Sequence, residues 1–319
     1  MKRTLAVSVL DLIEKRPEET EAAALARSLD LARHAELWGY RRFWIAEHHA
    51  TIGMLCSATP ILISYIAANT RSIRVGSGGV MLPNHAPLIV AEQFGTLDVL
   101  YPSRIDLGLG RARGTKVVAA QAIRKISDQT KEDFPALLRE LRTYLAPMDH
   151  GREVFANPGQ GSNIPIILLG STIFSAQLAG ELGFPFAFAA HFAADRLHEA
   201  ARVYHSTFRC AGGVEKPYLM ISLEILIANT DRHARDLFTT QQERLQHSYP
   251  PLSETARSVR EELMQSAVIG SPNTVRDRLE TVLQEVKADE VIALTETIKA
   301  SDRLHSYESL ARIASEIEI

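Results

Sequence analysis

The sequence predicts a (β/α)8 barrel. Short apolar runs rich in β-branched residues alternate with longer helical patterns, as is typical of repeated βα units around a parallel sheet. We count eight such runs, and the chain of 319 residues exceeds the length of about 250 that one barrel usually needs. We therefore expect one closed barrel domain over residues 1–319 rather than an open sheet.

The eight predicted strands lie between the helical segments. Their ends fall where an apolar run meets Gly, Pro or charged residues. We predict strands at residues 5–10, 42–46, 73–80, 105–110, 164–170, 186–190, 219–228 and 290–295.

The predicted helices place apolar residues three and four positions apart. Residues 24–37 and 137–145 are clear cases, and we expect their apolar faces to pack against the outside of the barrel. Thr20 and Ser57 each precede an apolar run, and Ser271 precedes a proline, as helix-capping residues do.

Two segments interrupt the alternation of strands and helices. Residues 146–163 are rich in Pro and Gly, which predicts a short hairpin or a loop at the edge of the site. Residues 231–267 hold two helical patterns separated by Tyr249-Pro250-Pro251, and we place them as an insertion between the seventh and eighth strands. Such an insertion either shapes access to the active site or forms an outer helix pair.

Composition excludes several classes of function. Hydrophobic residues make up 46% of the chain and charged residues 23%, so a large core can form without disulfides or metal. The net charge of -3 comes from mixed acids and bases, with no basic run to neutralise a nucleic acid. Cys56 and Cys210 give no disulfide framework, which favours a cytoplasmic protein. No apolar run approaches the roughly 18 residues of a membrane span, and Asp11 and Glu14 interrupt the first run, so we expect no signal peptide.

The ligand-facing residues of a barrel come from the carboxyl ends of its strands and the following loops. Here those ends carry glycine, histidine and small hydroxyl residues with one arginine, a set that suits a planar anionic cofactor better than hydrolysis. Glycine there lets a ligand approach the backbone closely. The candidate residues are Glu47, His48, His49, Gly78, Gly79, Gly110, Arg111, Gly170, Ser171, Thr172, Ser175 and His191.

The pair His48-His49 raises the possibility of a metal site. Adjacent residues of an extended chain point to opposite faces, so both imidazoles cannot bind one ion, and we expect no metal. We expect one histidine to line the pocket while the other faces the core or the helix layer.

The glycines around Arg111 have two further interpretations. The segment from Gly108 to Gly114 is similar to a dinucleotide-binding loop, but Arg113 takes the place of the third glycine and the segment follows the fourth strand. Arg111 supplies either a fixed charge for a phosphate or one half of an ion pair with Asp98 or Asp106.

The loop from Gly170 to Ser175 follows a predicted strand and opens a helix. The N–H groups of a helix N-terminus bind phosphate readily, whereas the alternative is that Ser171 or Thr172 only caps the helix. His191 ends the sixth predicted strand, where it contacts either a ligand or a neighbouring loop.

Several of these motifs together resemble the bacterial-luciferase-like flavin monooxygenases. They are Phe43-Trp-Ile-Ala-Glu-His-His49, the segment from Arg74 to Thr115, and Gly270-Ser-Pro-Asn-Thr-Val275. The resemblance covers nearly the whole chain and is closest to shorter, single-component members grouped with a polyketide-tailoring enzyme. It implies a TIM barrel, a homodimer, and reduced FMN delivered by a separate reductase, or deazaflavin F420 as in other branches.

The resemblance also implies a reaction and roles for the candidate residues. Reduced FMN would react with O2 to give a C4a-hydroperoxide, which would oxygenate an apolar or aromatic small molecule such as an aldehyde, ketone or polyketide. His48 would assist the oxygen chemistry, and Gly78-Gly79 would form a non-prolyl cis peptide beneath the flavin ring. Arg111 and the Gly170–Ser175 loop would hold the phosphate, while Glu47, His49 and His191 would face the substrate.

Two alternatives and two departures stay open at this point. The alternatives are hydride transfer with F420, which needs no O2, and a flavin-binding protein without catalysis. Many relatives carry Pro-Gly-Thr-Asp where this chain has Arg113-Gly114-Thr115-Lys116, which puts the phosphate contacts there in doubt. The insertion at residues 231–267 is also short by comparison.

Overall fold

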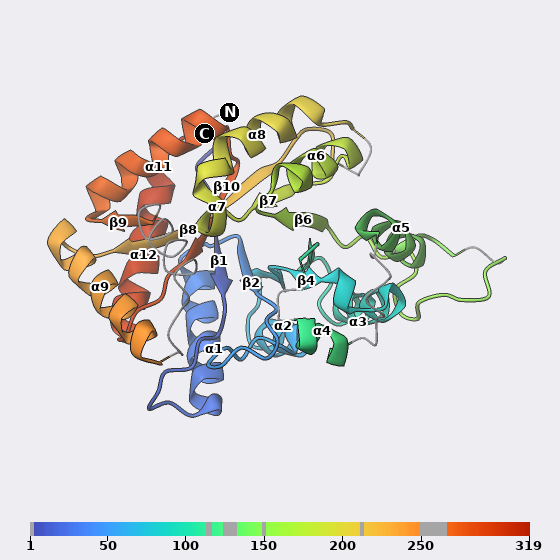
Figure 1. Cartoon of the computed structure of the whole chain (residues 1–319), viewed down its shortest axis with the longest axis horizontal. Helices are drawn as coiled ribbons and strands as arrows, with labels where there is room; N and C mark the ends of the chain where they lie inside the picture. Colours follow the sequence, from blue (N-terminus) through green and yellow to red (C-terminus); the bar gives the residue numbers. More distant parts are fainter. Residues whose placement is uncertain (1–2, 113–116, 124–132, 149–150, 211–213, 249–266) are drawn as a thin grey trace.

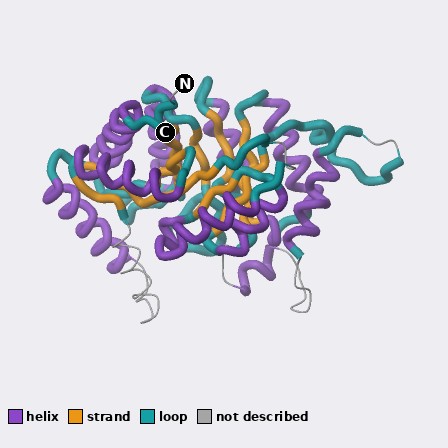
Figure 2. The backbone as a smooth tube through the Cα atoms, turned by 90° about the horizontal axis from the view of Figure 1, so that it is seen from above, coloured by secondary structure: helices purple, strands orange, loops and turns teal. Residues whose placement is uncertain are grey.

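The computed structural model describes residues 3–112, 117–123, 133–148, 151–210, 214–248 and 267–319. Within these ranges, parallel strands pair in the order β10-β1-β2-β3-β5-β6-β7-β8, and β8 pairs with β10 to close the barrel. The strands lie at the centre with helices around them (Figure 1 and Figure 2). The predicted (β/α)8 barrel is therefore confirmed.

Each predicted strand overlaps an observed one. The strands are β1 (Ala6–Asp11), β2 (Arg42–Ile45), β3 (Arg74–Ser77), β4 (Val80–Met81), β5 (Ile105–Gly110), β6 (Ile166–Gly170), β7 (Phe186–Phe188), β8 (Leu219–Ile227), β9 (Val268–Gly270) and β10 (Glu290–Leu294).

The prediction of one continuous strand over residues 73–80 is wrong, because Gly78 and Gly79 separate β3 from β4. The Ser77 hydroxyl donates to the Gly108 carbonyl oxygen at 2.8 Å and accepts from the Gly108 N–H at 3.0 Å, in place of a regular ladder. A Cβ on Gly108 would lie 2.1 Å from the Ser77 carbonyl oxygen, so only glycine permits this approach. The Gly78-Gly79 peptide is cis, and β4 then pairs with the end of β5.

The helices cover the outside of the barrel. Thr20 caps α1 by accepting a hydrogen bond from the Ala23 N–H, and Ser271 occupies the N-cap of α11, as predicted. Ser57 is not a cap, because α2 begins at Thr59. The helices are α1 (Glu21–Leu37), α2 (Thr59–Ala68), η1 (Leu82–Asn84), α3 (Pro87–Leu100), α4 (Val117–Ile123), α5 (Phe134–Leu145), α6 (Ile173–Leu182), α7 (Ala190–Ala193), η2 (Ala194–Arg196), α8 (Leu197–Thr207), α9 (Asp231–Ser248), α11 (Pro272–Val286) and α12 (Ala300–Glu316).

The two interrupting segments have different structures. The described part of residues 146–163 contains turns and no strand, so it is a loop rather than a hairpin, and Gly159 packs tightly against Gly95 of α3. In the insertion, α9 packs on the end of β8 through a small apolar cluster that includes Leu226 and Phe238. The second helical pattern predicted there lies mostly at residues 249–266, outside the described residues.

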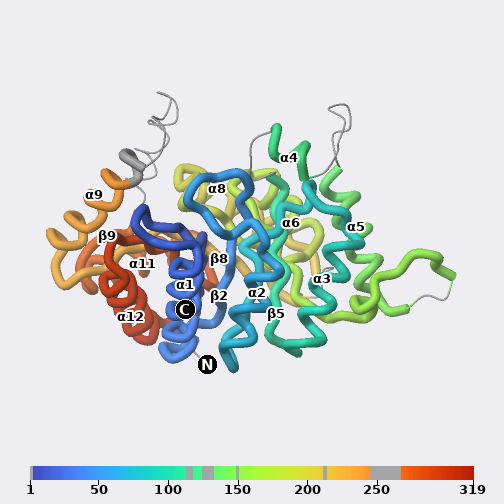
Figure 3. The backbone as a smooth tube through the Cα atoms, turned by 90° about the horizontal axis from the view of Figure 1, so that it is seen from below, coloured from blue at the N-terminus to red at the C-terminus, as the bar shows by residue number. Residues whose placement is uncertain are grey.

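The two ends of the described chain lie side by side (Figure 3), where Thr4 and Glu318 form an antiparallel bridge. Among the helices that the structure describes, none combines the length and apolar character needed to cross a membrane.

A buried ionic network fills the amino-terminal end of the barrel interior. Arg42 on β2 donates from Nη1 to Asp106 on β5 at 2.7 Å and from Nε to Glu290 on β10 at 2.9 Å. Arg74 on β3 also donates to Asp106, at 2.6 Å, and the Tyr218 hydroxyl donates to Glu290 at 2.7 Å. Burial alone would lower the pKa of Arg42. The nearby carboxylates of Glu290 and Asp106 outweigh burial and raise this pKa above its ordinary value of 12.5, so the guanidinium stays charged.

Replacing Arg42 with Met should lower the free energy of unfolding by about 3–5 kcal/mol, because Asp106 and Glu290 would keep buried charges with one fewer cation. Urea denaturation measures the change. The matched control is Arg41→Met: the Arg41 side chain is 48% exposed and 3.8 Å from Glu290, so its loss should change stability by less than about 1 kcal/mol. Equal effects of the two substitutions would contradict the central role of Arg42.

Candidate active site

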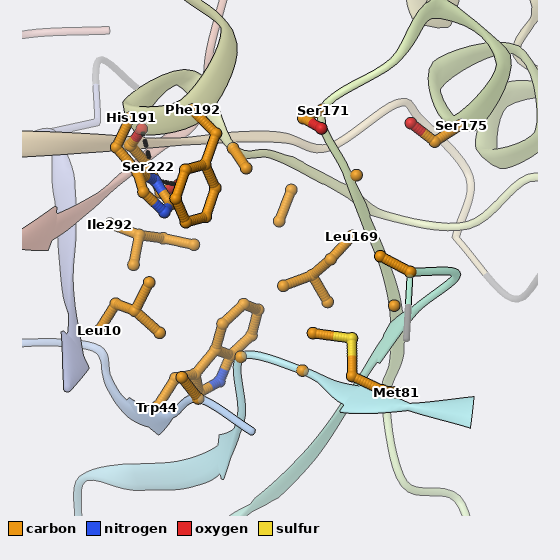
Figure 4. A pocket seen from close by; sticks show the side chains of 18 of the residues that line it. Leu10, Trp44, Met81, Leu169, Ser171, Ser175, His191, Phe192, Ser222 and Ile292 are labelled. Atoms are coloured by element: carbon orange, nitrogen blue, oxygen red, sulfur yellow. Dashed lines mark hydrogen bonds between the residues drawn. The ribbon is translucent and has the colours of Figure 1, made fainter. Parts of the chain in front are cut away.

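A cavity opens at the carboxyl ends of the barrel strands (Figure 4). Most of the candidate residues line this cavity, and they come from the ends of five different strands. Those that line it are His48, Gly78, Gly79, Gly110, Arg111, Gly170, Ser171, Thr172, Ser175 and His191.

The cavity exists because inward-facing residues near the strand ends are small. Ala46, Gly78 and Ala189 directly follow their strands and Gly110 ends β5, and none of these four residues carries a side chain larger than a methyl group. Larger apolar side chains form the walls, among them Leu10, Trp44, Leu169 and Ile292 in Figure 4. The result is an apolar slot with a side-chain-free strip at Gly78-Gly79.

One end of the cavity carries the hydroxyl groups at the start of α6. The Thr172 side chain accepts from the Ser175 N–H at 3.2 Å, and the Thr172 N–H donates back to the Ser175 hydroxyl at 3.3 Å. This is a capping box, so the helix-cap interpretation is correct for Thr172. Both side chains also line the cavity, together with Ser171. Capping therefore does not remove the N-terminus of α6 from the site.

Arg111 lies beside this end of the cavity. Its guanidinium is 4.6 Å from the centre of the Phe174 ring, a cation–π contact that orients the side chain. The predicted alternative of an ion pair is not observed, because Asp106 binds Arg42 and Arg74, and Asp98 accepts from Ser162. The Arg113 to Lys116 segment, for which the sequence analysis expects altered phosphate contacts, lies outside the described residues.

The opposite end of the cavity holds His191 and Ser222 (Figure 4). His191 Nδ1 lies 2.6 Å from the Ser222 hydroxyl oxygen. Burial lowers the pKa of His191 to about 4, and the nearby His48 adds to this effect. His191 is therefore a neutral imidazole at neutral pH. The Phe192 ring packs beside it, with ring centroids 4.2 Å apart.

Glu47 and His49 are not among the residues that line the cavity, contrary to the prediction. Glu47 is only 2% exposed, and its Oε1 lies 2.9 Å from His49 Nε2 and 2.8 Å from His85 Nε2. Its other oxygen accepts from the Met81 N–H at 3.3 Å. Adjacent His48 and His49 thus separate as expected, one toward the cavity and one toward a buried carboxylate.

The three side chains Glu47, His49 and His85 hold their ligand atoms within 4.8 Å of one another, which is compatible with a metal ion as well as with hydrogen bonds. His49 and His85 belong to different βα units, so the spacing of His48 and His49 alone does not predict this cluster. Burial alone would raise the pKa of Glu47, but His85 and His49 outweigh it and hold that pKa below its ordinary value of 4.5. The cluster connects the loop after β2 to Met81 at the end of β4 and to His85 after η1.

Sequence reasoning missed several lining residues. Trp44, Met81, Phe192 and Ser222 all line the cavity. The alternation of side chains along a strand identifies Trp44 and Ser222 as inward-facing once the strand register is known. No local signal distinguishes Met81 or Phe192 from other apolar residues near a strand end.

The comparisons with known proteins agree with this architecture. A family model described as luciferase-like monooxygenase matches residues 5–290. A luciferase-like monooxygenase of Escherichia coli (strain K12) is 41% identical over 330 residues, covering 99% of this chain and 98% of its own. The N-acetyl-S-alkylcysteine monooxygenase of Bacillus subtilis (strain 168) is 39% identical over 187 residues, covering 57% of this chain and 56% of its own.

Solved structures share the fold. That of apo-MsnO8 has a TM-score of 0.87 at 34% identity and covers 99% of this chain and 100% of that one. The oxygenating constituent of 3,6-diketocamphane monooxygenase from Pseudomonas putida, in complex with FMN, has a TM-score of 0.77 at 17% identity, covering 99% of both chains. An F420-dependent secondary alcohol dehydrogenase has a TM-score of 0.73 at 13% identity, covering 98% of this chain and 99% of that one.

Replacing Glu47 with Gln should lower the free energy of unfolding at pH 7 by roughly 1–3 kcal/mol, because a buried carboxylate that serves two imidazoles becomes an amide. The pKa of Glu47 is lowered in the folded state, so its contribution is fully present above its ordinary pKa of 4.5 and is lost as the pH falls through the folded value. Urea denaturation at pH 7 and pH 4 measures this difference.

The exposed Glu199→Gln is the control and should be neutral at both pH values. A Glu47→Gln variant as stable as the parent at pH 7 would contradict the assigned role. A chelator distinguishes the two occupants of the cluster: an unchanged melting temperature favours hydrogen bonds, and a lower one favours a metal ion.

Proposed function

The chain belongs to the luciferase-like monooxygenase family, and from this premise we propose that it is an FMN-dependent monooxygenase of apolar or aromatic small molecules. Membership of this family makes the protein an oxidoreductase. We infer the cofactor, the substrate class and the site residues from the cavity. The substrate class is that of aldehydes, ketones and polyketides.

The observation that carries the proposal is the division of the cavity into three parts. Hydroxyl groups at the start of α6 and the Arg111 side chain lie at one end of the cavity. Apolar walls and the Gly78-Gly79 strip, which carries no side chains, form its middle. The imidazoles of His48 and His191 line the remainder. FMN likewise carries a phosphate at one end and, at the other, a planar ring that contains its reacting centre. The residues present therefore fit this cofactor.

Each part has a role in the proposal. The first-turn N–H groups of α6, the Ser171 hydroxyl and Arg111 hold the phosphate by charge-assisted hydrogen bonds. Gly78 and Gly79 admit the ring close to the backbone, and the apolar walls exclude water from it. His48 lines the cavity and supplies or accepts the proton that oxygen chemistry requires. When bound, reduced FMN supplies the electrons that activate O2.

The proposal extends to partners and location. A separate reductase supplies the reduced flavin. Exposed apolar side chains, Ile61 and Tyr65 on α2 and Ile89 on the neighbouring α3, supply a surface for a homodimer. Cys56 and Cys210 are free thiols, and the exposed Cys210 fits the reducing cytoplasm.

Two other functions use the same cavity. F420 has a phosphate and a planar ring as well, so the site admits hydride transfer without O2, as in the F420-dependent dehydrogenase of similar fold. A protein that binds flavin without turnover is the third possibility, and the position of His48 argues against it.

Anaerobic titration of the protein with reduced FMN and with reduced F420, followed by rapid mixing with O2, separates these functions. We expect tight binding of reduced FMN and flavin reoxidation that differs from that of free flavin in stopped-flow absorbance. Preference for F420 would move the assignment to hydride transfer. Binding of FMN with reoxidation identical to that of the free flavin would favour the non-catalytic protein.

Two substitutions test the proposed roles of Arg111 and His48. Arg111→Ala should weaken FMN binding about tenfold through the loss of a charge-assisted contact, whereas exposed Arg202→Ala on α8 should leave it unchanged. His48→Ala should keep the FMN affinity and slow single-turnover reoxidation by about 100-fold. Undiminished affinity would remove Arg111 from the site, and an unchanged rate would remove the role of His48.

A further inference from the structure

The thioether of Met81 is an oxidisable group inside the candidate active site. Met81 ends β4 and lines the cavity, and Figure 4 shows its sulfur and methyl group directed into the cavity. Among the described lining residues, Met81 supplies the one sulfur atom. Peroxides readily convert a thioether to a sulfoxide, so this side chain is the natural target of an oxidant that forms in the cavity.

Two features of the barrel hold the Met81 side chain in this position. The Met81 N–H donates to the Glu47 carboxylate at 3.3 Å, which fixes the backbone at the end of β4. The sulfur lies over Gly110 of β5, where a Cβ would come within 2.9 Å of it. A larger residue at position 110 would displace the thioether. The sulfur is therefore presented to the cavity by two barrel strands rather than by a surface loop.

The other sulfur atoms of the described residues do not line the cavity. Met148 is 59% exposed in the loop after α5, and Met220 on β8 is 1% exposed. Burial raises the pKa of the Cys56 thiol to about 12, so it is not a reactive thiolate at neutral pH, whereas Cys210 is exposed. A peroxide in the solvent would thus meet Met148 and Cys210 first, and a peroxide formed in the cavity would meet Met81 first.

We propose that Met81 is a modification site at which the enzyme oxidises itself when no substrate is bound. The inference rests on the proposed function, because the oxidant is a hydroperoxide formed in the cavity from reduced FMN and O2. The distal peroxide oxygen forms a bond to the Met81 sulfur as the O–O bond breaks. The sulfur gives up an electron pair and becomes a sulfoxide, and the other peroxide oxygen takes up the proton and leaves as a hydroxyl group.

The modification changes the cavity in a way that slows later turnover. A sulfoxide places a polar oxygen among the apolar walls, where it is unfavourable without a hydrogen-bond donor. We therefore expect weaker FMN binding after oxidation of Met81. A bound substrate takes the oxygen atom instead and protects the thioether. The site consequently limits the reduction of O2 by protein that has no substrate.

Isotope labelling tests the proposal. Reduced FMN is supplied in repeated cycles with isotopically labelled O2 and no organic substrate, in the dark, with catalase to remove peroxide from the solvent. Trypsin releases Met81 within residues 75–104 and Met148 within residues 143–152, each as the one methionine of its peptide. Mass spectrometry should find about five-fold more labelled sulfoxide at Met81 than at Met148. Hydrogen peroxide added without reduced flavin should reverse this order.

Two variants connect the label to the loss of activity. Met81→Leu keeps an apolar side chain of similar volume and removes the sulfur, and Met148→Leu is the matched control outside the cavity. Each protein's rate of flavin reoxidation is compared with that of its own first cycle. The parent and Met148→Leu should slow about three-fold over the cycles, whereas Met81→Leu should keep its initial rate.

The outcomes distinguish the inference from the function on which it rests. Failure of the parent protein to bind reduced FMN, or reoxidation identical to that of free flavin, would overturn both. Normal binding and reoxidation with no label at Met81, with a label that catalase abolishes, or with equal slowing of the parent and Met81→Leu would overturn the inference alone.

Discussion

The contact of Arg42 with Asp106 and Glu290 is the constraint on which the rest of the barrel depends. One guanidinium joins β2, β5 and β10 inside the barrel, and Arg74 extends the network to β3. Burying these charges is favourable only when each has its partner, which ties the register of strands that are far apart in sequence. The charges also occupy the amino-terminal end of the interior. The space left for a ligand is consequently at the carboxyl end.

At the carboxyl end the interior changes from large or charged side chains to glycine and alanine. The close approach of β3 and β5 at Gly108 precedes the Gly78-Gly79 segment, and β4 then resumes the pairing with β5 at Leu109 and Gly110. One oxygen of the Glu47 carboxylate accepts a hydrogen bond from the Met81 N–H of β4. The other oxygen contacts the imidazoles of His49 and His85. The bare strip of the cavity is thus supported from behind by a buried polar cluster, which is how a strip without side chains keeps a defined shape.

The polar groups of the cavity divide into two ends with different chemistry. Arg111, fixed against Phe174, and the capped N-terminus of α6 form an end suited to an anion. His191 and Ser222 form an end that is polar and carries no fixed charge. An apolar slot with one charged end and one uncharged end binds an amphipathic cofactor in one direction only. The proposed FMN-dependent oxygenase follows from this polarity.

The sequence by itself determined the (β/α)8 class, the approximate strands and the strand ends at which glycine, histidine and arginine occur. These features are local, because period, composition and turn residues record them within one βα unit. Only the tertiary structure decided that His85 joins Glu47 and His49, that Ser222 faces His191, and that Asp106 is taken by Arg42 and Arg74. Each of these contacts joins different βα units, and the closure and register of the barrel set which side chains meet inside it. No pattern within a single segment contains that information.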